Sequence, residues 1–536
     1  MPVPLTYPGV YIEEIPSGVR TITGVATSIT AFIGRALRGP LDSDDDGPVV
    51  INSYGDFERN FGALDPGYPM GYAVRDFYLN GGAQAVIVRL FKAADGAVTK
   101  SVIDGDKLAN LPLEAATPGS WSANLRVRVD YNVSAEVAQN YGLAAADLFN
   151  LTVRDTTSGA QESFLNLSVK ESPRRVDRVF ESSSSLIRVT TLGDKLPAKH
   201  DDVPAGKSAW DDDKYSTGVT KDKAGADSAA LNKAADYEGN EDAKTGIYAL
   251  KKVDLFNILC IPPDVRDGNT DPDVYSKAME FCAERRAMLL VDPPNTWSSA
   301  GAITQQNFKA LTDLGLTGVY ARNAALFFPR VQEADPKRQG QIDTFVPCGI
   351  VAGVMARTDV ARGVWKAPAG LDASLNGVSG LAVQLTDAEN GMLNPIGVNC
   401  LRSFPLIGPV VWGSRTLRGA DLLADEYKYI PVRRLALYIE ESLFRGTQWV
   451  VFEPNDAPLW AQIRLNVGAF MQNLFRQGAF QGKTPQEAYF VKCDKETTTQ
   501  NDINLGIVNV VVGFAPLKPA EFVVIQLQQM AGQIQT

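Results

Sequence analysis

Two blocks of the chain share an alternation of short apolar strands and amphipathic helices, and this alternation limits the possible folds more than any other feature. In the block 22–91, "TSITAFIGRA" and "AQAVIVRLF" are typical of buried strands and enclose two helical patterns. In the block 250–330, the strand patterns "VDLFNILCIP", "AMLLVDPP" and "YARNAALFFPRV" alternate with helices. Such alternation is typical of parallel sheets with right-handed crossovers, so it predicts an α/β core.

A polar region separates the two blocks. "TVRDTTSGAQESFLNLSV" predicts a β-hairpin with its turn near Ser158 and Gly159. The stretch 193–246 consists mainly of Asp, Lys, Ala, Ser and Gly and has few large apolar residues, so we expect a surface loop there. The whole region is predicted to be a domain inserted into the first one.

The C-terminal part contains two well-marked helices. The first has an apolar face and is expected to end at Gly446; the face consists of Val432, Leu435, Ala436, Ile439 and Leu443. The second is expected to have Asp456 as its N-cap and to end at Gly478. Between them "QWVVFEP" predicts a strand, and "INLGIVNVVVGFAP" and "KPAEFVVIQLQQM" predict two more.

These patterns predict a mixed α/β, multi-domain protein with a discontinuous core. We expect an N-terminal arm at 1–21, an α/β domain at 22–95 and 247–370, a β-rich inserted domain at 96–246, a C-terminal α+β domain at 371–517 and a C-terminal arm at 518–536.

The chain starts and ends with a lone strand pattern. In "YPGVYIEEIPSG" the apolar residues alternate between Pro8 and Pro16, as in an extended segment. "EFVVIQL" has the same character at the other end. The first segment comes before any element with which it could pair, which raises the question of what it binds; the second stands at the opposite end of the chain.

Reactive groups are few. The one histidine, His200, lies in the polar region, where we expect an exposed loop residue. "GAFQGKT" has three residues between its glycines, where a phosphate-binding P-loop has four. "DSDDDG" matches the start of a calcium loop, but its twelfth position is Ser53 instead of Glu. We therefore predict no catalytic, cofactor-binding or metal-binding residues.

Composition narrows the class of protein further. A net charge of −10 argues against general affinity for nucleic acid. The five cysteines lie far apart in apolar surroundings, which predicts buried free thiols and folding in a reducing cytosol. We also expect no secretory leader and no membrane-spanning segment.

Taken together, the motifs resemble one family, the sheath proteins of contractile bacteriophage tails. In the N-terminal part the resemblance lies in "YPGVYIEEIPSG", "GVATSITAFIGRALRGP", "SYGDFERNFG" and "GYAVRDFYLNGGAQAVIVRL". In the C-terminal part it lies in "VWGSRTL", "YIPVRRLALYIEESL", "QWVVFEPNDAPLWAQIR", "GAFQGKTPQEAYFVKCD" and "GFAPLKPAEFVVIQLQQ". It covers about 1–95 and 250–536 and leaves out the insertion.

The resemblance implies a structural subunit and no enzyme. Such subunits stack as six-fold rings around a tail tube and contract to drive the tube through a cell envelope. The implied partners are further copies of the chain, the tail tube protein, and baseplate and tail terminator proteins, with no direct binding of nucleic acid and no membrane insertion. The implied location is the virion tail, with assembly in the host cytoplasm.

The resemblance also implies roles for the two arms and for a set of basic residues. The terminal arms of the family add strands to the sheets of neighbouring subunits. The residues that we expect in this exchange are Val10, Tyr11, Ile12, Glu13 and Ile15 at one end, and Phe522, Val523, Val524, Ile525 and Leu527 at the other. As candidates for contact with an acidic tube surface we select Arg433, Arg434, Arg464, Arg476 and Lys483.

Three alternatives remain open at this point. One is the sheath of an R-type pyocin or another phage-derived injection system, although the large insertion favours a phage. Another is a static virion protein, which needs neither arms nor an interface with two states. An enzyme built on the α/β sheet is a third class, for which the sequence shows no site.

Overall fold

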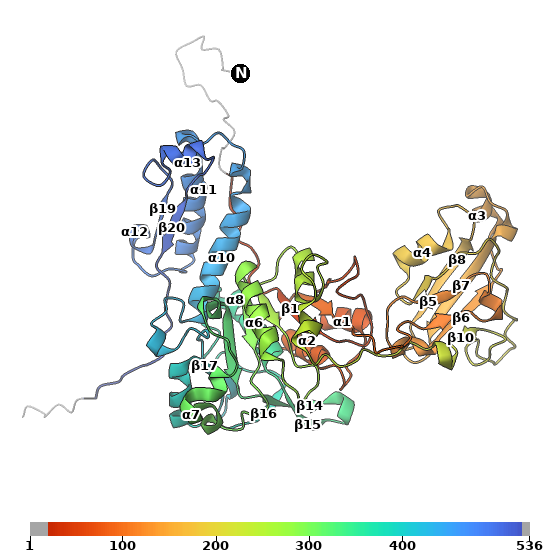
Figure 1. Cartoon of the computed structure of the whole chain (residues 1–536), viewed down its shortest axis with the longest axis horizontal. Coiled ribbons are helices and arrows are strands. Elements are labelled where there is room, and N and C mark those ends of the chain that lie inside the picture. The colour runs from red at the N-terminus through yellow and green to blue at the C-terminus, as the bar shows by residue number, and fades with distance from the viewer. Residues whose placement is uncertain (1–19, 528–536) are drawn as a thin grey trace, which may run out of the picture.

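The computed structural model describes residues 20–527, except for the side chains of 306–308. Three bodies are visible in Figure 1: a central trunk, an inserted lobe on the right and a C-terminal lobe at the upper left. We use "inserted lobe" for residues 98–226 and "C-terminal lobe" for residues 430–516. Each body has its own cluster of buried apolar side chains.

The trunk is built on an eight-stranded sheet with the order β18-β17-β13-β12-β11-β1-β3-β2. Its inner strands are parallel, and β2 and β18 pair antiparallel at the two edges. The strands are β1 (Thr30–Gly34), β2 (Val49–Ile51), β3 (Ala85–Arg89), β11 (Ile258–Cys260), β12 (Met288–Val291), β13 (Ala324–Phe328), β17 (Val398–Phe404) and β18 (Gly408–Val411). The predicted parallel α/β core is confirmed.

Helices cover both faces of this sheet, so that successive side chains of one strand enter different cores. Ala31 and Ile33 of β1 pack into the layer that contains α6, α7 and α9, whereas Phe32 packs into the layer of α1, α2 and α8. The helices are α1 (Tyr54–Phe61), α2 (Pro69–Leu79), α6 (Pro272–Glu284), α7 (Ala300–Thr312), α8 (Cys348–Arg362) and α9 (Asp387–Leu393). A small antiparallel sheet completes the trunk, with β14 (Val331–Asp335) between β15 (Gln341–Phe345) and β16 (Val378–Leu381).

The inserted lobe contains two antiparallel sheets and two short helices. One sheet has the order β10-β6-β7-β8 and the other β4-β5-β9. Its elements are β4 (Val102–Ile103), β5 (Leu113–Ala115), β6 (Leu125–Asp130), α3 (Ala135–Asn140), β7 (Leu148–Asp155), β8 (Gln161–Ser168), α4 (Val176–Ser183), β9 (Ile187–Val189) and β10 (Thr217–Gly218). The predicted hairpin is the pair β7 and β8.

The chain returns to the trunk earlier than its composition indicates. Leu231, Tyr237 and Ile247 lie in the same buried cluster as the trunk sheet, and α5 (Ala234–Glu238) belongs to this returning segment. Composition predicts a surface loop up to residue 246, which would include Leu231 and Tyr237. Three large apolar side chains are enough to hold the segment on the trunk, even though most of its residues are polar.

The prediction that His200 is an exposed loop residue is wrong. Its side chain is fully buried, with Nδ1 accepting a hydrogen bond from the Val129 N–H at 3.0 Å and Nε2 lying 2.9 Å from Thr217 Oγ1. The imidazole therefore fastens the loop 193–216 to strands β6 and β10. It is a structural residue in the lobe, held between two strands that are distant in sequence.

The C-terminal lobe is a pair of long helices with a two-stranded sheet. Its elements are α10 (Ile430–Gly446), α11 (Ala457–Arg476), α12 (Pro485–Ala488), β19 (Tyr489–Lys492), α13 (Gln500–Asn504) and β20 (Val511–Phe514). Asp456 caps α11 as predicted, because its side chain accepts a hydrogen bond from the Leu459 N–H. The strand predicted in "QWVVFEP" is wrong: Gln448–Val450 forms a 3-10 helix, and Phe452 stands fully exposed in the following turn.

Residues 20–25 pack on the C-terminal lobe before the chain enters the trunk sheet. The Arg20 guanidinium lies over the Trp449 ring, and the Val25 N–H donates to Ser442 Oγ at 3.2 Å. Ile22 lies in the apolar cluster of α10 and α11. The first described residues therefore lie on the C-terminal lobe, although the sequence assigned Ile22 to the α/β domain.

Candidate assembly surfaces

The described part of the C-terminal arm, residues 518–527, contains no helix or strand and extends away from the trunk (Figure 1). Its large apolar side chains are strongly exposed: 75% for Phe522, 82% for Val523, 82% for Val524, 78% for Ile525 and 94% for Leu527. Soluble proteins rarely expose such a contiguous apolar run without a binding role. This run contains all five residues that the sequence selected at this end.

Strands β19 and β20 form a small sheet that has two open edges. Within residues 20–527 these strands pair only with each other, from Tyr489 opposite Phe514 to Lys492 opposite Val511. The sheet rests on α11, where the Tyr489 hydroxyl donates to Gln472 Oε1 at 2.8 Å. An open edge offers unpaired backbone N–H and C=O groups to an incoming strand.

The N-terminal residues predicted for strand exchange, Val10, Tyr11, Ile12, Glu13 and Ile15, lie outside the described residues. The point from which they depart is defined, because Arg20 lies against the C-terminal lobe. The Arg20 N–H donates to Asn466 Oδ1 on α11 at 3.1 Å. The last described residue before the N-terminal arm thus contacts the helix that supports the open sheet.

Two of the five basic candidates are engaged inside the molecule. Arg434 is 4% exposed and is held by Asp359, which removes it from the set of surface residues. Arg433 contacts Asn323 Oδ1 through Nε at 3.2 Å and stacks on the Tyr427 ring. A helix pattern gives no sign of this, because the partners lie on distant segments.

The other three basic candidates lie on the C-terminal lobe. Arg476 and Lys483 are exposed, at the end of α11 and in the loop that follows it. Arg464 is half-buried, and its Nη1 donates to the backbone carbonyl of Cys493. Arg476 and Lys483 are therefore the members of the set that are best placed to meet a partner.

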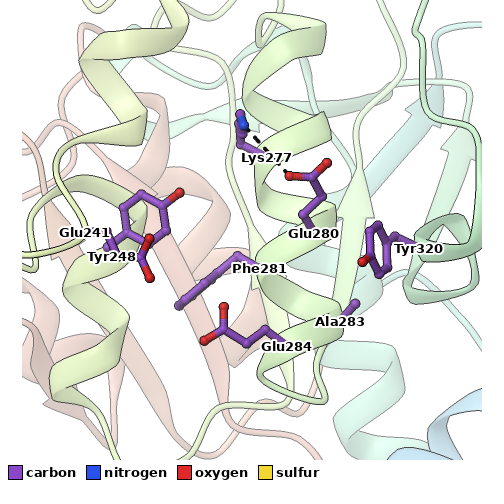
Figure 2. Close-up of a pocket in the computed structure, with 8 residues that line it drawn as sticks. All are labelled: Glu241, Tyr248, Lys277, Glu280, Phe281, Ala283, Glu284 and Tyr320. Atoms are coloured by element: carbon purple, nitrogen blue, oxygen red, sulfur yellow. Dashed lines mark ion pairs between the residues drawn. The ribbon is translucent and has the colours of Figure 1, made fainter.

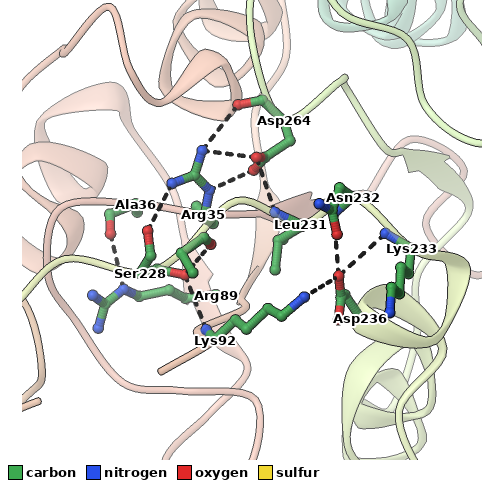
Figure 3. Close-up of polar contacts among 11 residues, drawn as sticks. Arg35, Ala36, Arg89, Lys92, Ser228, Leu231, Asn232, Lys233, Asp236 and Asp264 are labelled. Carbon is green, nitrogen blue, oxygen red and sulfur yellow. Dashed lines mark hydrogen bonds and ion pairs between the residues drawn. The ribbon is translucent and has the colours of Figure 1, made fainter. Parts of the chain in front are cut away.

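The carboxyl ends of the parallel strands, where α/β sheets commonly bind ligands, are occupied by the chain itself (Figure 3). Arg35 follows β1 and pairs with Asp264, which follows β11, with Nη2 and Oδ2 2.8 Å apart. Arg35 Nη1 also donates to the Ser228 carbonyl at 3.0 Å, and Asp264 Oδ2 accepts from the Leu231 N–H at 3.0 Å. This edge of the sheet holds the segment that returns from the inserted lobe.

A hollow of about 520 Å³ lies beside α6 (Figure 2). Glu241, Glu280 and Glu284 line it, together with Lys277, whose Nζ lies 3.8 Å from Glu280 Oε2. The three glutamates are exposed, so water screens their charges. The hollow is therefore a charged, solvent-exposed part of the trunk surface.

All five cysteines are buried free thiols, as predicted. Among residues 20–527, no group of three or more His, Cys, Asp or Glu side chains has an arrangement that could hold a metal ion. In the same range, no helix is both long enough and apolar enough to cross a bilayer.

Two family models match the chain. The phage tail sheath protein central domain matches residues 236–417, and the phage tail sheath C-terminal domain matches residues 424–530. Together they cover more than half of the chain. The chain belongs to the phage tail sheath protein family. The matched region begins within the segment that returns to the trunk, so the inserted lobe of this sheath protein lies outside both models.

Curated relatives of this sheath protein agree with the assignment. The tail sheath protein of Vibrio phage KVP40 is 31% identical over 127 residues, which are 24% of this chain and 18% of the relative. The tail sheath protein of Enterobacteria phage T4 is 25% identical over 218 residues, which are 40% of this chain and 30% of the relative. The matches thus span less than a third of the length of either curated relative.

The fold is shared with solved sheaths over nearly the whole length. The sheath of the extracellular contractile injection system PVC, solved in its contracted state, has a TM-score of 0.54 and 21% identity, over 98% of this chain and 99% of that one. At this identity the likeness establishes the fold. By its family the chain is a tail sheath protein, and its fold is that of solved sheaths.

Proposed function

We propose that this sheath protein assembles as stacked six-fold rings around a tail tube, and that contraction of the assembled sheath drives the tube through the envelope of a target cell. The observation that carries the proposal is the C-terminal arm, whose apolar side chains from Phe522 to Leu527 are exposed in the single subunit. A static shell protein has no need of such a segment. We propose no enzymatic activity.

The arm acts by adding a strand to a neighbouring copy, and the open edges of β19 and β20 are the acceptor that we propose. A strand of six residues gains several backbone hydrogen bonds, each worth about 0.5–1.5 kcal/mol net. Burial of Phe522, Val524 and their neighbours adds about 1.5–3 kcal/mol for each side chain. Ordering the arm costs about 1–2 kcal/mol per residue, so each junction is modest and the sheath is stabilised by repetition.

The N-terminal arm joins the same junction in our proposal. Its departure point, Arg20, contacts α11, which supports β19. An arm that leaves from this helix and an arm that leaves from the trunk give each subunit two links to its neighbours. Rings connected in this way stay linked while they move relative to one another.

The partners follow from the same arrangement. We propose that the tube binds weakly to the basic surface at Arg476 and Lys483, because contraction has to break this contact. Exposed ion pairs contribute only about 0–1 kcal/mol each, which suits a contact of this kind. Baseplate and tail terminator proteins bind the two ends of the sheath, which forms in the host cytoplasm and functions on the virion tail.

A phage-derived injection system is the second candidate for the particle. It is favoured by the likeness to the contracted PVC sheath, which covers 98% of this chain. The subunit has the same task in both particles. Electron microscopy of assembled protein distinguishes a helical sheath of two lengths from a static shell of one form.

Disulfide crosslinking between two differently marked chains tests the junction. Val524→Cys in one chain and Val511→Cys on β20 in the other should form an intermolecular crosslink after assembly, and Phe490→Cys on β19 tests the opposite edge. The native cysteines do not interfere, because all five are buried. The crosslink should form in both extended and contracted sheaths.

Val360→Cys provides the matched control, because this residue is 83% exposed on trunk helix α8 and lies outside the proposed junction. It should give no crosslink with Val524→Cys. Crosslinks that form only within one chain, when Val524→Cys is combined with either β-strand cysteine, would show that the arm folds back on its own subunit and would refute the junction.

A further inference from the structure

The C-terminal arm contacts the trunk through an ion pair between Glu521 and Arg415. Arg415 Nε donates to Glu521 Oε1 at 2.8 Å, and Nη2 donates to Oε2 at 2.6 Å. The Tyr429 hydroxyl donates to the same Oε2 at 3.2 Å. Two parallel hydrogen bonds from a planar guanidinium fix the orientation of a carboxylate as well as its position.

Arg415 is also held by several groups of the trunk. Its side chain is fully buried, and Nη1 donates to the carbonyls of Asn394 and Gly419 and to Asp421 Oδ1. Its backbone is bound on both sides by Asn399 of β17: the Arg415 N–H donates to Asn399 Oδ1 at 2.6 Å, and Asn399 Nδ2 donates to the Arg415 carbonyl at 2.7 Å. Arg415 is therefore bound directly to strand β17 of the trunk sheet.

The segments on the two sides of Glu521 differ in their surroundings. Before it, residues 517–520 line a cleft of about 930 Å³ between the trunk and the C-terminal lobe, which Glu521 and Phe522 also line. After it, every described side chain, from 522 to 527, is exposed. Glu521 is thus the last described residue of the arm whose side chain is partly buried.

We propose that the Arg415–Glu521 pair is the docking point that sets the direction of the C-terminal arm, so that the strand-forming segment begins at Phe522 and a pull on the arm is borne by the trunk sheet. The inference rests on the proposed function, since the direction matters only for a segment that binds a neighbour. Arg415 and Glu521 are positioning residues for that contact. The pair fastens the chain directly after the segment from Pro516 to Pro519.

The physical benefit is preorganisation. A segment that leaves the trunk in one direction loses less conformational freedom when it pairs with a neighbour than a segment that swings freely from Pro516. An arm that is not fixed at Glu521 also transmits less force to the trunk, because tension first has to extend the segment that begins at Pro516. Fixing Glu521 thus favours both assembly and mechanical linkage of the rings.

Glu521 is the residue to change, because its removal leaves the subunit able to fold. Arg415 keeps Asp421 as a charged partner, at 3.0 Å, together with two carbonyl acceptors. Removal of the Arg415 side chain, in contrast, leaves a space in the trunk. We therefore compare Glu521→Ala and Glu521→Gln with Lys518→Gln, a change of charge in the same segment at an exposed position.

The direct measurement is a distance distribution between two spin labels in unassembled subunits. Gln526→Cys and Val360→Cys place one label on the exposed arm and one on α8, and the buried native cysteines stay unlabelled. We expect a narrow distribution in the parent and in Lys518→Gln, a broad one in Glu521→Ala, and an intermediate one in Glu521→Gln, which retains a neutral acceptor. The thermal unfolding midpoint should be the same in all four.

Assembly is measured separately, as the lowest protein concentration that gives sheaths. Loss of charge-assisted hydrogen bonds should raise it about tenfold in Glu521→Ala. A narrow distribution in Glu521→Ala, or a broad one accompanied by a lowered unfolding midpoint, overturns the docking role. If the parent forms no sheath, the proposed function fails, and the spin-label comparison still decides whether Glu521 fixes the arm.

Discussion

Arg434 of α10 and Asp359 of α8 form two hydrogen bonds, of 2.9 Å between Nη1 and Oδ1 and 2.6 Å between Nη2 and Oδ2, and each side chain is 4% exposed. Thr27 joins them: its hydroxyl donates to Asp359 Oδ2 at 2.7 Å, and its carbonyl accepts from Arg434 Nη2 at 2.9 Å. The pair connects the C-terminal lobe, the trunk and the segment that leads from the N-terminal arm. It couples the C-terminal lobe to the trunk, from which the C-terminal arm extends.

We predict that Asp359→Asn lowers the free energy of unfolding by about 3 kcal/mol or more, because it leaves a buried guanidinium without its counter-charge. Urea denaturation of the unassembled subunit measures the change. Asp313→Asn is the control, since Asp313 pairs with Lys309 while both side chains are 59% exposed, and we expect a loss below about 0.5 kcal/mol. Equal losses in the two variants would contradict a special role for the buried pair.

The inserted lobe should be dispensable for assembly. The Ala226 N–H donates to the Val98 carbonyl at 2.7 Å, so the two ends of the lobe lie together, and a short Gly/Ser linker can replace residues 99–225. We expect the shortened protein to form sheaths. Replacing 193–246 instead should destabilise the trunk, because it removes Leu231 and Tyr237 from the core. Electron microscopy and thermal unfolding check both results, and failure of the 99–225 variant to assemble, although folded, would refute the prediction.

The stability of the inserted lobe should depend on pH through His200, the one histidine of the chain. Burial, reinforced by the nearby Arg128 and Lys107, lowers the pKa of His200 from 6.5 to about 4. The unfolded lobe therefore takes up the proton first as the pH falls. The stabilisation that neutral His200 provides is complete above about pH 6.5 and is lost progressively between pH 6.5 and 4.

Hydrogen exchange of the amides in β6 and β10 measures this dependence. Protection should fall between pH 7 and 4.5, beyond the intrinsic pH dependence of exchange, and His200→Gln should remove the part of the fall that is due to the imidazole. The variant should also be less protected than the parent at pH 7, because Val129 and Thr217 lose their partner. A parent and a variant with the same pH dependence would exclude His200 as the cause.

Charge reversal at Arg476 and Lys483 should weaken binding to the tube and leave sheath self-assembly unchanged. Each contact contributes about 0–1 kcal/mol, so the double Glu variant should bind several-fold more weakly at low salt, with a smaller difference at high salt. Co-sedimentation with purified tubes measures the binding. Lys207→Glu combined with Lys221→Glu is the matched control, since both are exposed lysines of the inserted lobe. Equal binding of the two double variants at low salt would remove Arg476 and Lys483 from the tube contact.

The elements that could be predicted are those whose signals lie close together in the sequence. The α10 and α11 helices carry a 3.6-residue apolar period, and Asp456 caps α11 three residues before the amide that it binds. Strand β1 was predictable because it is short, apolar and enclosed by turns. "QWVVFEP" is also short and mainly apolar, but no neighbouring strand pairs with it in the described structure, and a strand is stable only with a partner.

The sequence by itself determined the local elements, the parallel core, the family and the apolar character of the C-terminal arm. Only the tertiary structure decided that Arg434 and His200 are buried, that the chain re-enters the trunk near Leu231, and that the arm is fastened at Glu521. The physical reason is the range of the interactions. Helix periods and caps act over a few residues, whereas Arg434 meets Asp359 and Arg415 meets Glu521 only after distant segments have packed together.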